Sequence, residues 1–176
     1  MSWLYPFVSR NPPSNRLVVE LAELGPSDRV LDVGCGPGAA VRAAATLVME
    51  SVGADPSERM LRAARRRSKD LHNVRYIQAP AHRLPFDDRR FSVVWTIHSM
   101  HHWGDEIAGL AEVRRVLSPG GRFLVVERLD PGKPWGTDEA GIERISGMMR
   151  DVGFTDIEWT VRRAGRAEEG VIVGRR

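Results

Sequence analysis

Short apolar runs alternate along the chain with segments whose apolar residues recur every three or four positions. Runs typical of buried strands lie at 29–33, 51–55, 74–79, 91–97, 122–127, 155–161 and 170–174. Segments with helical periodicity lie at 14–24, 39–50, 56–68, 105–117 and 139–154. Strands that alternate with helices of this length predict βαβ units, and so an α/β three-layer sandwich around a seven-stranded, mostly parallel sheet.

Several local signals refine this pattern. The last two predicted strands are joined by 162–169, a segment too short for a parallel crossover, so we expect an antiparallel hairpin at the C-terminal end of the sheet. Ser14 is suited to cap the first helix. Pro56 is expected at the first helical position of the third helix. The glycine turn at 118–121 is expected to end the fourth helix before the next strand begins.

The composition narrows the class of protein. The 176 residues are 42% hydrophobic and 28% charged, which is ordinary for a globular chain and predicts a single domain over 1–176. Cys35 is the single cysteine, which excludes an intramolecular disulfide and favours a reducing compartment. No apolar run is long enough to span a membrane, and the N-terminus lacks the pattern of a secretory signal. We therefore expect a cytoplasmic protein.

The net charge of the chain gives little information about its binding partners. The net charge of +3 arises from 26 basic and 23 acidic residues, which is a weak field for a domain of this size. Basic residues gather at 59–70, where a solvated helix face is the simple interpretation and an RNA contact is the alternative. No aromatic residues are interleaved there, so nucleic-acid binding is not expected.

A glycine-rich loop between a predicted strand and helix carries the main chemical signal. In "VLDVGCGPGAA" (30–40), Gly34 and Gly36 allow positive φ and close approach of a ligand, and Gly38 allows tight entry into the helix. The pattern formally fits a dinucleotide loop. However, a carboxylate at Asp32 would repel a pyrophosphate while suiting a ligand that carries an ammonium group. A dinucleotide-binding fold also needs a second mononucleotide-binding half, and the predicted C-terminal hairpin does not supply one.

Four segments together resemble the class I S-adenosylmethionine (SAM)-dependent methyltransferases. "VLDVGCGPG" resembles their glycine-rich motif, and "VGADPSERML" resembles their second-strand motif, with Asp55 as the acidic residue that binds ribose hydroxyls. "RLPFDDRRFSVVWTIHSMHHW" and "EVRRVLSPGGRFLVVE" resemble the fourth-strand and fifth-strand regions of the ubiquinone/menaquinone-biosynthesis-like (methyltransferase type 11) subgroup. The resemblance covers roughly residues 16–127. It implies a Rossmann-like fold, SAM as cofactor and methyl transfer as the activity.

The resemblance also implies a set of cofactor-binding positions. They are Asp32, Gly34, Cys35, Gly36, Gly38, Asp55, Pro56, Met60, Ala81, His82, Thr96 and Ile97. Two positions depart from the family pattern: Pro80 stands where an aspartate usually contacts adenine, and Ser92 replaces an aspartate remote from the sulfur. Adenine recognition would then rest on the backbone at 81–82 or on packing by Met60 and Leu61.

Simpler interpretations of these residues stay open. Asp55 could only cap the following helix, and Asp32 could brace the loop rather than touch a ligand. Cys35 has no evident base partner, so nucleophilic use is not expected, and the resemblance implies contact through its backbone.

Three histidines follow the predicted fourth strand. His98, His101 and His102 could bind zinc, but no cysteine or second acidic ligand accompanies them, so no metal is expected. They could instead shape the acceptor pocket, with one imidazole as proton acceptor, or simply pack against a helix.

We expect a methyltransferase that acts on a small-molecule acceptor by direct in-line displacement. The alternatives are a non-catalytic, regulatory SAM-binding domain, suggested by Pro80, and an RNA or protein methyltransferase, suggested by the basic segment 59–70. The segments that would specify the acceptor are 1–15, 98–104 and 128–140. The first could act as a lid, and a second subunit in a homodimer is another way to complete the acceptor site.

Overall fold

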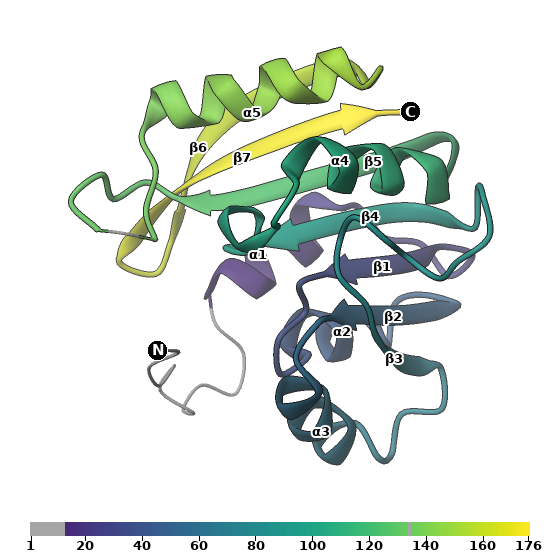
Figure 1. Ribbon diagram of the computed structural model, residues 1–176. Helices are drawn as coiled ribbons and strands as arrows, with labels where there is room; N and C mark the ends of the chain where they lie inside the picture. Colours follow the sequence, from purple (N-terminus) through teal and green to yellow (C-terminus); the bar gives the residue numbers. More distant parts are fainter. Residues whose placement is uncertain (1–12, 134) are drawn as a thin grey trace.

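A seven-stranded sheet with the order β3-β2-β1-β4-β5-β7-β6 forms the centre of the protein (Figure 1). The computed structural model describes residues 13–133 and 135–176. β7 is antiparallel to both of its neighbours, while every other neighbouring pair is parallel, which confirms the predicted hairpin and the predicted α/β fold. The strands are β1 (Arg29–Val33), β2 (Glu50–Asp55), β3 (Val74–Gln78), β4 (Phe91–Ile97), β5 (Leu117–Arg128), β6 (Thr155–Ala164) and β7 (Ala167–Arg175).

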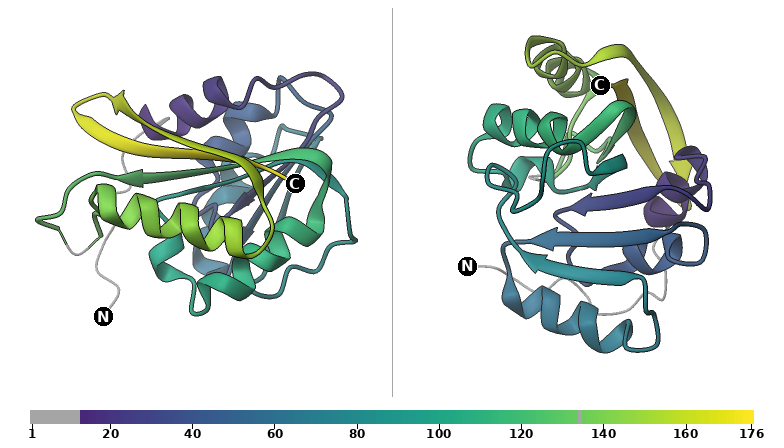
Figure 2. Two further views of the ribbon diagram at one scale, coloured as in Figure 1. Left: turned by 90° about the horizontal axis from the view of Figure 1, so that it is seen from above. Right: turned by 90° about the vertical axis from the view of Figure 1, so that its right-hand side faces the viewer.

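Helices cover both faces of this sheet. Figure 2 shows α1 and α2 on one side and α4 and α5 on the other. On the first side, Val18 of α1 and Ala40 of α2 pack against Trp95 of β4, and α3 packs beside α2. On the second side, Leu110 and Ile145 join the larger apolar cluster. The helices are α1 (Pro13–Leu21), α2 (Ala39–Ala44), α3 (Glu58–Arg67), α4 (Glu106–Val116) and α5 (Glu139–Asp151), with a 3₁₀ helix η1 (Met100–His102).

Two predicted helix starts are wrong. Ser14 lies inside α1 rather than at its cap, and its hydroxyl donates to Glu169 Oε1 at 2.7 Å. α3 begins at Glu58 rather than at Pro56, because Ser57 is the cap and accepts a hydrogen bond from the Met60 amide.

Two predicted helix ends also differ. α2 ends at Ala44 rather than at residue 50. The Asn73 side-chain amide donates to the carbonyl oxygens of Ala45 and Val48, at 2.7 and 3.0 Å, and so satisfies this backbone outside a helix. The glycine turn at 118–121 does not separate α4 from a strand, because β5 begins at Leu117 and contains the turn as an irregularity in its pairing with β4.

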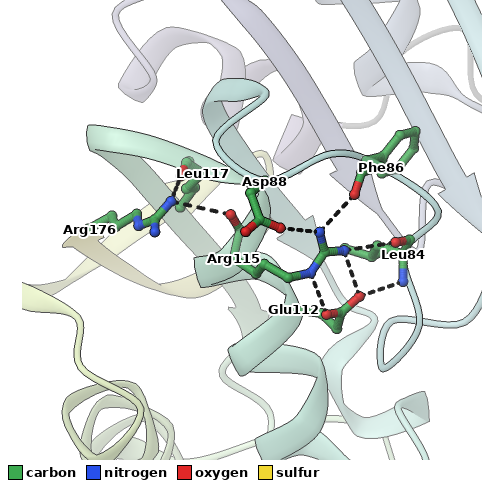
Figure 3. Close-up of polar contacts among 7 residues, drawn as sticks. All are labelled: Leu84, Phe86, Asp88, Glu112, Arg115, Leu117 and Arg176. Atoms are coloured by element: carbon green, nitrogen blue, oxygen red, sulfur yellow. Dashed lines mark hydrogen bonds and ion pairs between the residues drawn. The ribbon is translucent and has the colours of Figure 1, made fainter.

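Arg115 fastens α4 to the loop before β4 (Figure 3). Its guanidinium donates to the carbonyl oxygens of Leu84 and Phe86, at 2.9 and 2.7 Å, and to the carboxylates of Asp88 and Glu112. This clamp lies at the amino end of the parallel strands. The opposite edge, where those strands end, carries the candidate site.

The predicted lid 1–15 lies mostly outside the described part of the chain. Residues 1–12 are not described, and residues 13–15 begin α1. None of the helices that the structure describes is long and apolar enough to cross a bilayer.

Candidate functional site

The loop after β1 turns back over the end of β2. The Gly34 and Cys35 amides both donate to the Ala54 carbonyl oxygen, at 2.8 and 3.1 Å. Gly34 has a φ of 77°, and a Cβ there would overlap the Ser99 hydroxyl, so this position requires glycine. Gly36 has a φ of 51°, but a Cβ there would meet nothing within 4 Å. The loop is therefore packed against protein at Gly34 and open to a ligand at Gly36.

The Cys35 side chain faces the protein interior. It is buried with Val41, Leu61 and Tyr76 between α2, α3 and the sheet. Burial raises the pKa of the Cys35 thiol, which disfavours the nucleophilic thiolate. Cys35 thus has only its backbone to offer a ligand. Gly38, with a φ of 72°, lies against the Tyr76 ring at the start of α2.

Asp55 connects the glycine loop to the second strand. Its Oδ2 accepts from the Gly36 amide and its Oδ1 accepts from the Ser57 amide, both at 2.8 Å. The carboxylate therefore organises both the loop and the entry to α3. An ionised carboxylate has about four lone-pair sites, so Asp55 can still accept hydrogen bonds from a ligand.

Asp32 is a buried carboxyl beneath the same loop, with 3% of its surface exposed. Burial, assisted by the nearby charge of Asp55, raises the pKa of Asp32 to about 7. A cationic ligand group close to Asp32 would favour its ionised form. Asp32 and Asp55 together make this end of the sheet acidic.

The end of β3 lies next to Asp55, because the Ala79 amide donates to the Asp55 carbonyl oxygen at 3.3 Å. The chain then turns, with the Pro80 carbonyl oxygen accepting from the Arg83 amide. Ala81 is buried in the main core and His82 is exposed.

The remaining predicted cofactor positions differ in how much surface they offer. Met60 is half-buried and Pro56 is exposed, whereas Leu61 is fully buried. At the end of β4, Ile97 is half-buried, and Thr96 is fully buried with no hydrogen-bond partner for its hydroxyl among the described residues. Leu61 and Thr96 therefore have no surface on which a ligand could lie.

The three predicted histidines border the ends of β4 and β5 with two buried carboxylates. His98 Nε2 lies 2.8 Å from Glu169 Oε2, and His101 Nδ1 lies 3.6 Å from Glu127 Oε2. Burial and the neighbouring His101 lower the pKa of His102. Among the residues that the structure places, no group of three His, Cys, Asp or Glu side chains is arranged to hold a metal ion.

Sequence reasoning missed both carboxylates. Glu127 is the next-to-last residue of the apolar strand β5, as Asp32 is of β1, so its position in the strand could have selected it. Its Oε1 accepts from the Met100 amide at 3.1 Å and so holds η1. Glu169 had no such signal, because it reaches this edge only through the antiparallel direction of β7.

Known protein families and proteins resemble this chain in sequence. The family described as a methyltransferase domain (Methyltransf_11) matches residues 31–125. An uncharacterized methyltransferase, YcgJ of Bacillus subtilis, is 36% identical over 67% of this chain and 47% of its own length. The UbiE ubiquinone/menaquinone biosynthesis C-methyltransferase of Ectopseudomonas mendocina is 38% identical over 68% of this chain and 49% of its own length.

Solved structures show the same fold. The crystal structure of Bacillus subtilis YcgJ has a TM-score of 0.72 at 22% identity and covers 93% of this chain and 97% of that one. A SAM-dependent methyltransferase from Aquifex aeolicus has a TM-score of 0.76 at 18% identity, with 91% and 88% covered. The chain belongs to the methyltransferase domain family, and within it to the UbiE-like class I SAM-dependent methyltransferases. It spans about half the length of the two curated relatives named above.

The cofactor of this family is SAM, and the residues present fit it. The loop is open at Gly36, Asp55 retains acceptor capacity, and Asp32 supplies a buried carboxyl that suits an ammonium group. Pro80 is the departure, since it supplies neither a carboxylate nor an N–H group.

Proposed function

We propose that the chain transfers a methyl group from SAM to a small-molecule acceptor. The observation that supports this most directly is the glycine loop, which is bonded to Asp55 at Gly36 and is open there to a ligand. When bound, SAM supplies an electrophilic methyl group on a sulfonium. The task of the protein is then to orient the acceptor and to exclude water.

The proposed roles of the cofactor residues follow their positions. Asp55 accepts hydrogen bonds from the ribose hydroxyls, and Asp32 lies on the side of the ammonium group. The backbone of 34–38 forms the floor of the site. The surfaces of Pro56, Met60 and His82 and the backbone of Ala81 border the adenine, and Ile97 borders the sulfur side.

The acceptor side is proposed to lie over the ends of β4 and β5. Residues 98–104, 128–133 and 135–140 border it from this chain, and His98, His101 and His102 supply its polar groups. Completion of this side by a second subunit stays a prediction.

Calorimetry with SAM and with its demethylated product S-adenosylhomocysteine (SAH) tests cofactor binding. We expect both to bind the wild type and Asp70→Ala, a control at an exposed aspartate just after α3. We expect Asp55→Ala to weaken binding by roughly 100-fold, since it removes charge-assisted hydrogen bonds. A wild type that binds neither ligand would refute the proposal.

Transfer is tested with SAM that carries a radiolabelled methyl group and an extract separated into small molecules, RNA and protein. We expect label in the small-molecule fraction. Label in RNA or protein would favour the macromolecular alternative. SAH binding without any transfer would favour a regulatory SAM-binding domain, the alternative that Pro80 suggests.

A further inference from the structure

His98 has a backbone conformation that is uncommon among residues other than glycine. Its φ is 49°, in the left-handed region that side chains other than glycine rarely adopt. Its amide donates to the Val126 carbonyl oxygen at 2.8 Å, which joins the end of β4 to β5. Such strain costs roughly 1–3 kcal/mol and persists only where surrounding contacts determine it. At His98 the surrounding contact is made by the imidazole ring.

That ring is held by a carboxylate that is itself fully enclosed. Glu169 has no exposed surface, and its Oε2 lies 2.8 Å from His98 Nε2. Its Oε1 accepts from the Ser14 hydroxyl at 2.7 Å and lies 3.7 Å from an Arg128 guanidinium nitrogen. Three elements distant in sequence, α1, β5 and β7, thus place one carboxylate behind one imidazole.

The charge of Glu169 determines which nitrogen carries the proton. Burial alone would raise the pKa of Glu169, but other contacts outweigh it and the pKa is lowered: the hydrogen bond from His98, the charge of that imidazole when it is protonated, the hydrogen bond from Ser14 and the charge of Arg128. An ionised carboxylate can only accept, so Nε2 of His98 must donate. In the neutral ring, Nδ1 then has a free lone pair. The structure gives Nδ1 no hydrogen bond to the described residues, and 22% of the side chain is exposed.

The other two histidines are less suited to take up a proton. His101 is 3.6 Å from Glu127, beyond hydrogen-bond distance, and its ring lies against that of His102, with centroids 4.0 Å apart. The charged side chains around His98 and its partner are Glu169 itself and Arg128. Glu127 instead holds η1, where it accepts a hydrogen bond from the Met100 amide.

We propose that His98 is the proton acceptor for a hydroxyl-bearing substrate and that Glu169 is its positioning residue. This inference rests on the proposed methyl transfer. The acceptor O–H bond breaks and its proton moves to Nδ1. The oxygen electron pair forms the new O–CH₃ bond, and the electrons of the broken C–S bond return to sulfur, which becomes a neutral thioether. The proton on the imidazolium then leaves to water.

The chemistry of the acceptor points to oxygen. An amine attacks with a lone pair that is already available and can lose its proton afterwards. A neutral hydroxyl becomes a good nucleophile only as its proton leaves, so it gains most from a fixed base. A histidine held by a buried carboxylate is an arrangement that suits this need.

The two main test variants can each be compared with a control variant that makes the same substitution at an exposed residue. His98→Asn removes the imidazole and places at φ 49° the residue type that best tolerates that backbone after glycine. Glu169→Gln keeps the shape but loses the charge, with exposed Glu168→Gln as its neighbour control. His72→Asn, at an exposed histidine before β3, is the control for His98. Thermal unfolding checks each fold, and Ser14→Ala tests Glu169 indirectly if Glu169→Gln fails to fold.

The first readout needs no acceptor. Long-range ¹H–¹⁵N NMR spectra at alkaline pH report which ring nitrogen of His98 is protonated. We expect Nε2–H in the wild type and loss of this preference in Glu169→Gln. A wild-type ring protonated at Nδ1 would overturn the proposal.

The second readout uses labelled SAM with catechol, aniline and thiophenol as matched probes. We expect transfer to catechol, with kcat reduced roughly 100-fold or more in His98→Asn and roughly tenfold in Glu169→Gln, while KM and SAH affinity stay within about twofold. The rise of kcat with pH should vanish in His98→Asn, and added imidazole should restore activity to His98→Gly.

Two results would overturn the proposal. One is wild-type kcat in His98→Asn, and the other is transfer to aniline or thiophenol in preference to catechol. A wild type that fails to bind SAH would instead refute the proposed function, so the two failures are distinguishable.

Discussion

The Gly36 amide donates to Asp55 Oδ2 at 2.8 Å, so the residue that ends β2 holds the loop that follows β1. The same carboxylate accepts from Ser57 through its other oxygen. We expect Asp55→Asn to destabilise the fold by about 2 kcal/mol, because an amide nitrogen would face one of the two N–H donors. Chemical denaturation measures this. Stability equal to the wild type would show that these bonds do not hold the loop.

The glycines of the loop should respond differently to a methyl group. Gly34→Ala should destabilise by about 3 kcal/mol, because a Cβ overlaps the Ser99 hydroxyl in addition to the cost of positive φ. Gly36→Ala should cost about 1 kcal/mol, because only the backbone cost applies, yet it should weaken SAH binding. Denaturation and calorimetry separate the two effects. Equal loss of stability in both variants would contradict the packing described at Ser99.

Asp32 should make stability depend on pH. Its pKa is about 7 in the folded protein against an ordinary value of 3.8. Between these two pH values the folded state keeps a proton on Asp32 that the unfolded state has lost. The stabilising contribution of Asp32 to the fold is therefore fully present below pH 3.8 and is lost as the pH rises through 7. We expect Asp32→Asn to unfold at higher denaturant than the wild type at pH 8, with the difference shrinking toward pH 4. A difference that does not vary with pH would count against this burial.

The same carboxyl should link SAM binding to protons. If an ammonium group favours ionised Asp32, binding below pH 7 releases a proton, and affinity rises as the pH approaches that value. Calorimetry in two buffers of different ionisation enthalpy measures the release. Asp32→Asn should abolish it, and an unchanged release in this variant would assign the proton to another group.

The Arg115 clamp should matter more than an exposed ion pair. Arg115→Ala removes four partners from a side chain that is 31% exposed, and we expect a loss of about 2 kcal/mol. Arg144→Ala, which breaks the pair with Glu106 on a side chain 56% exposed, should cost less than about 1 kcal/mol. Thermal unfolding of both variants checks the contrast, which a larger loss in Arg144→Ala would reverse.

Periodicity predicted the strand and helix types and the antiparallel hairpin, because those follow from local apolar patterns and from the short 162–169 connection. Element ends were harder, since Ser57 and Asn73 decide them through side-chain hydrogen bonds that compete with backbone ones. In the site, the glycine-rich loop led to Asp32, and the resemblance of "VGADPSERML" to the second-strand motif led to Asp55. Glu169 could not be found in this way, since its place depends on where β7 inserts.

The position of β7 also affects how the protein folds. β6 and β7 are joined only by Gly165 and Arg166, so they can pair locally, but the other edge of β7 must then dock against β5. Contacts between β5 and β7 span a long stretch of chain, and such contacts form late and slow folding. Because Glu169 lies on β7, its pairing with His98 forms only when this hairpin docks. A partly folded chain could hold the glycine loop and still lack the histidine–carboxylate pair.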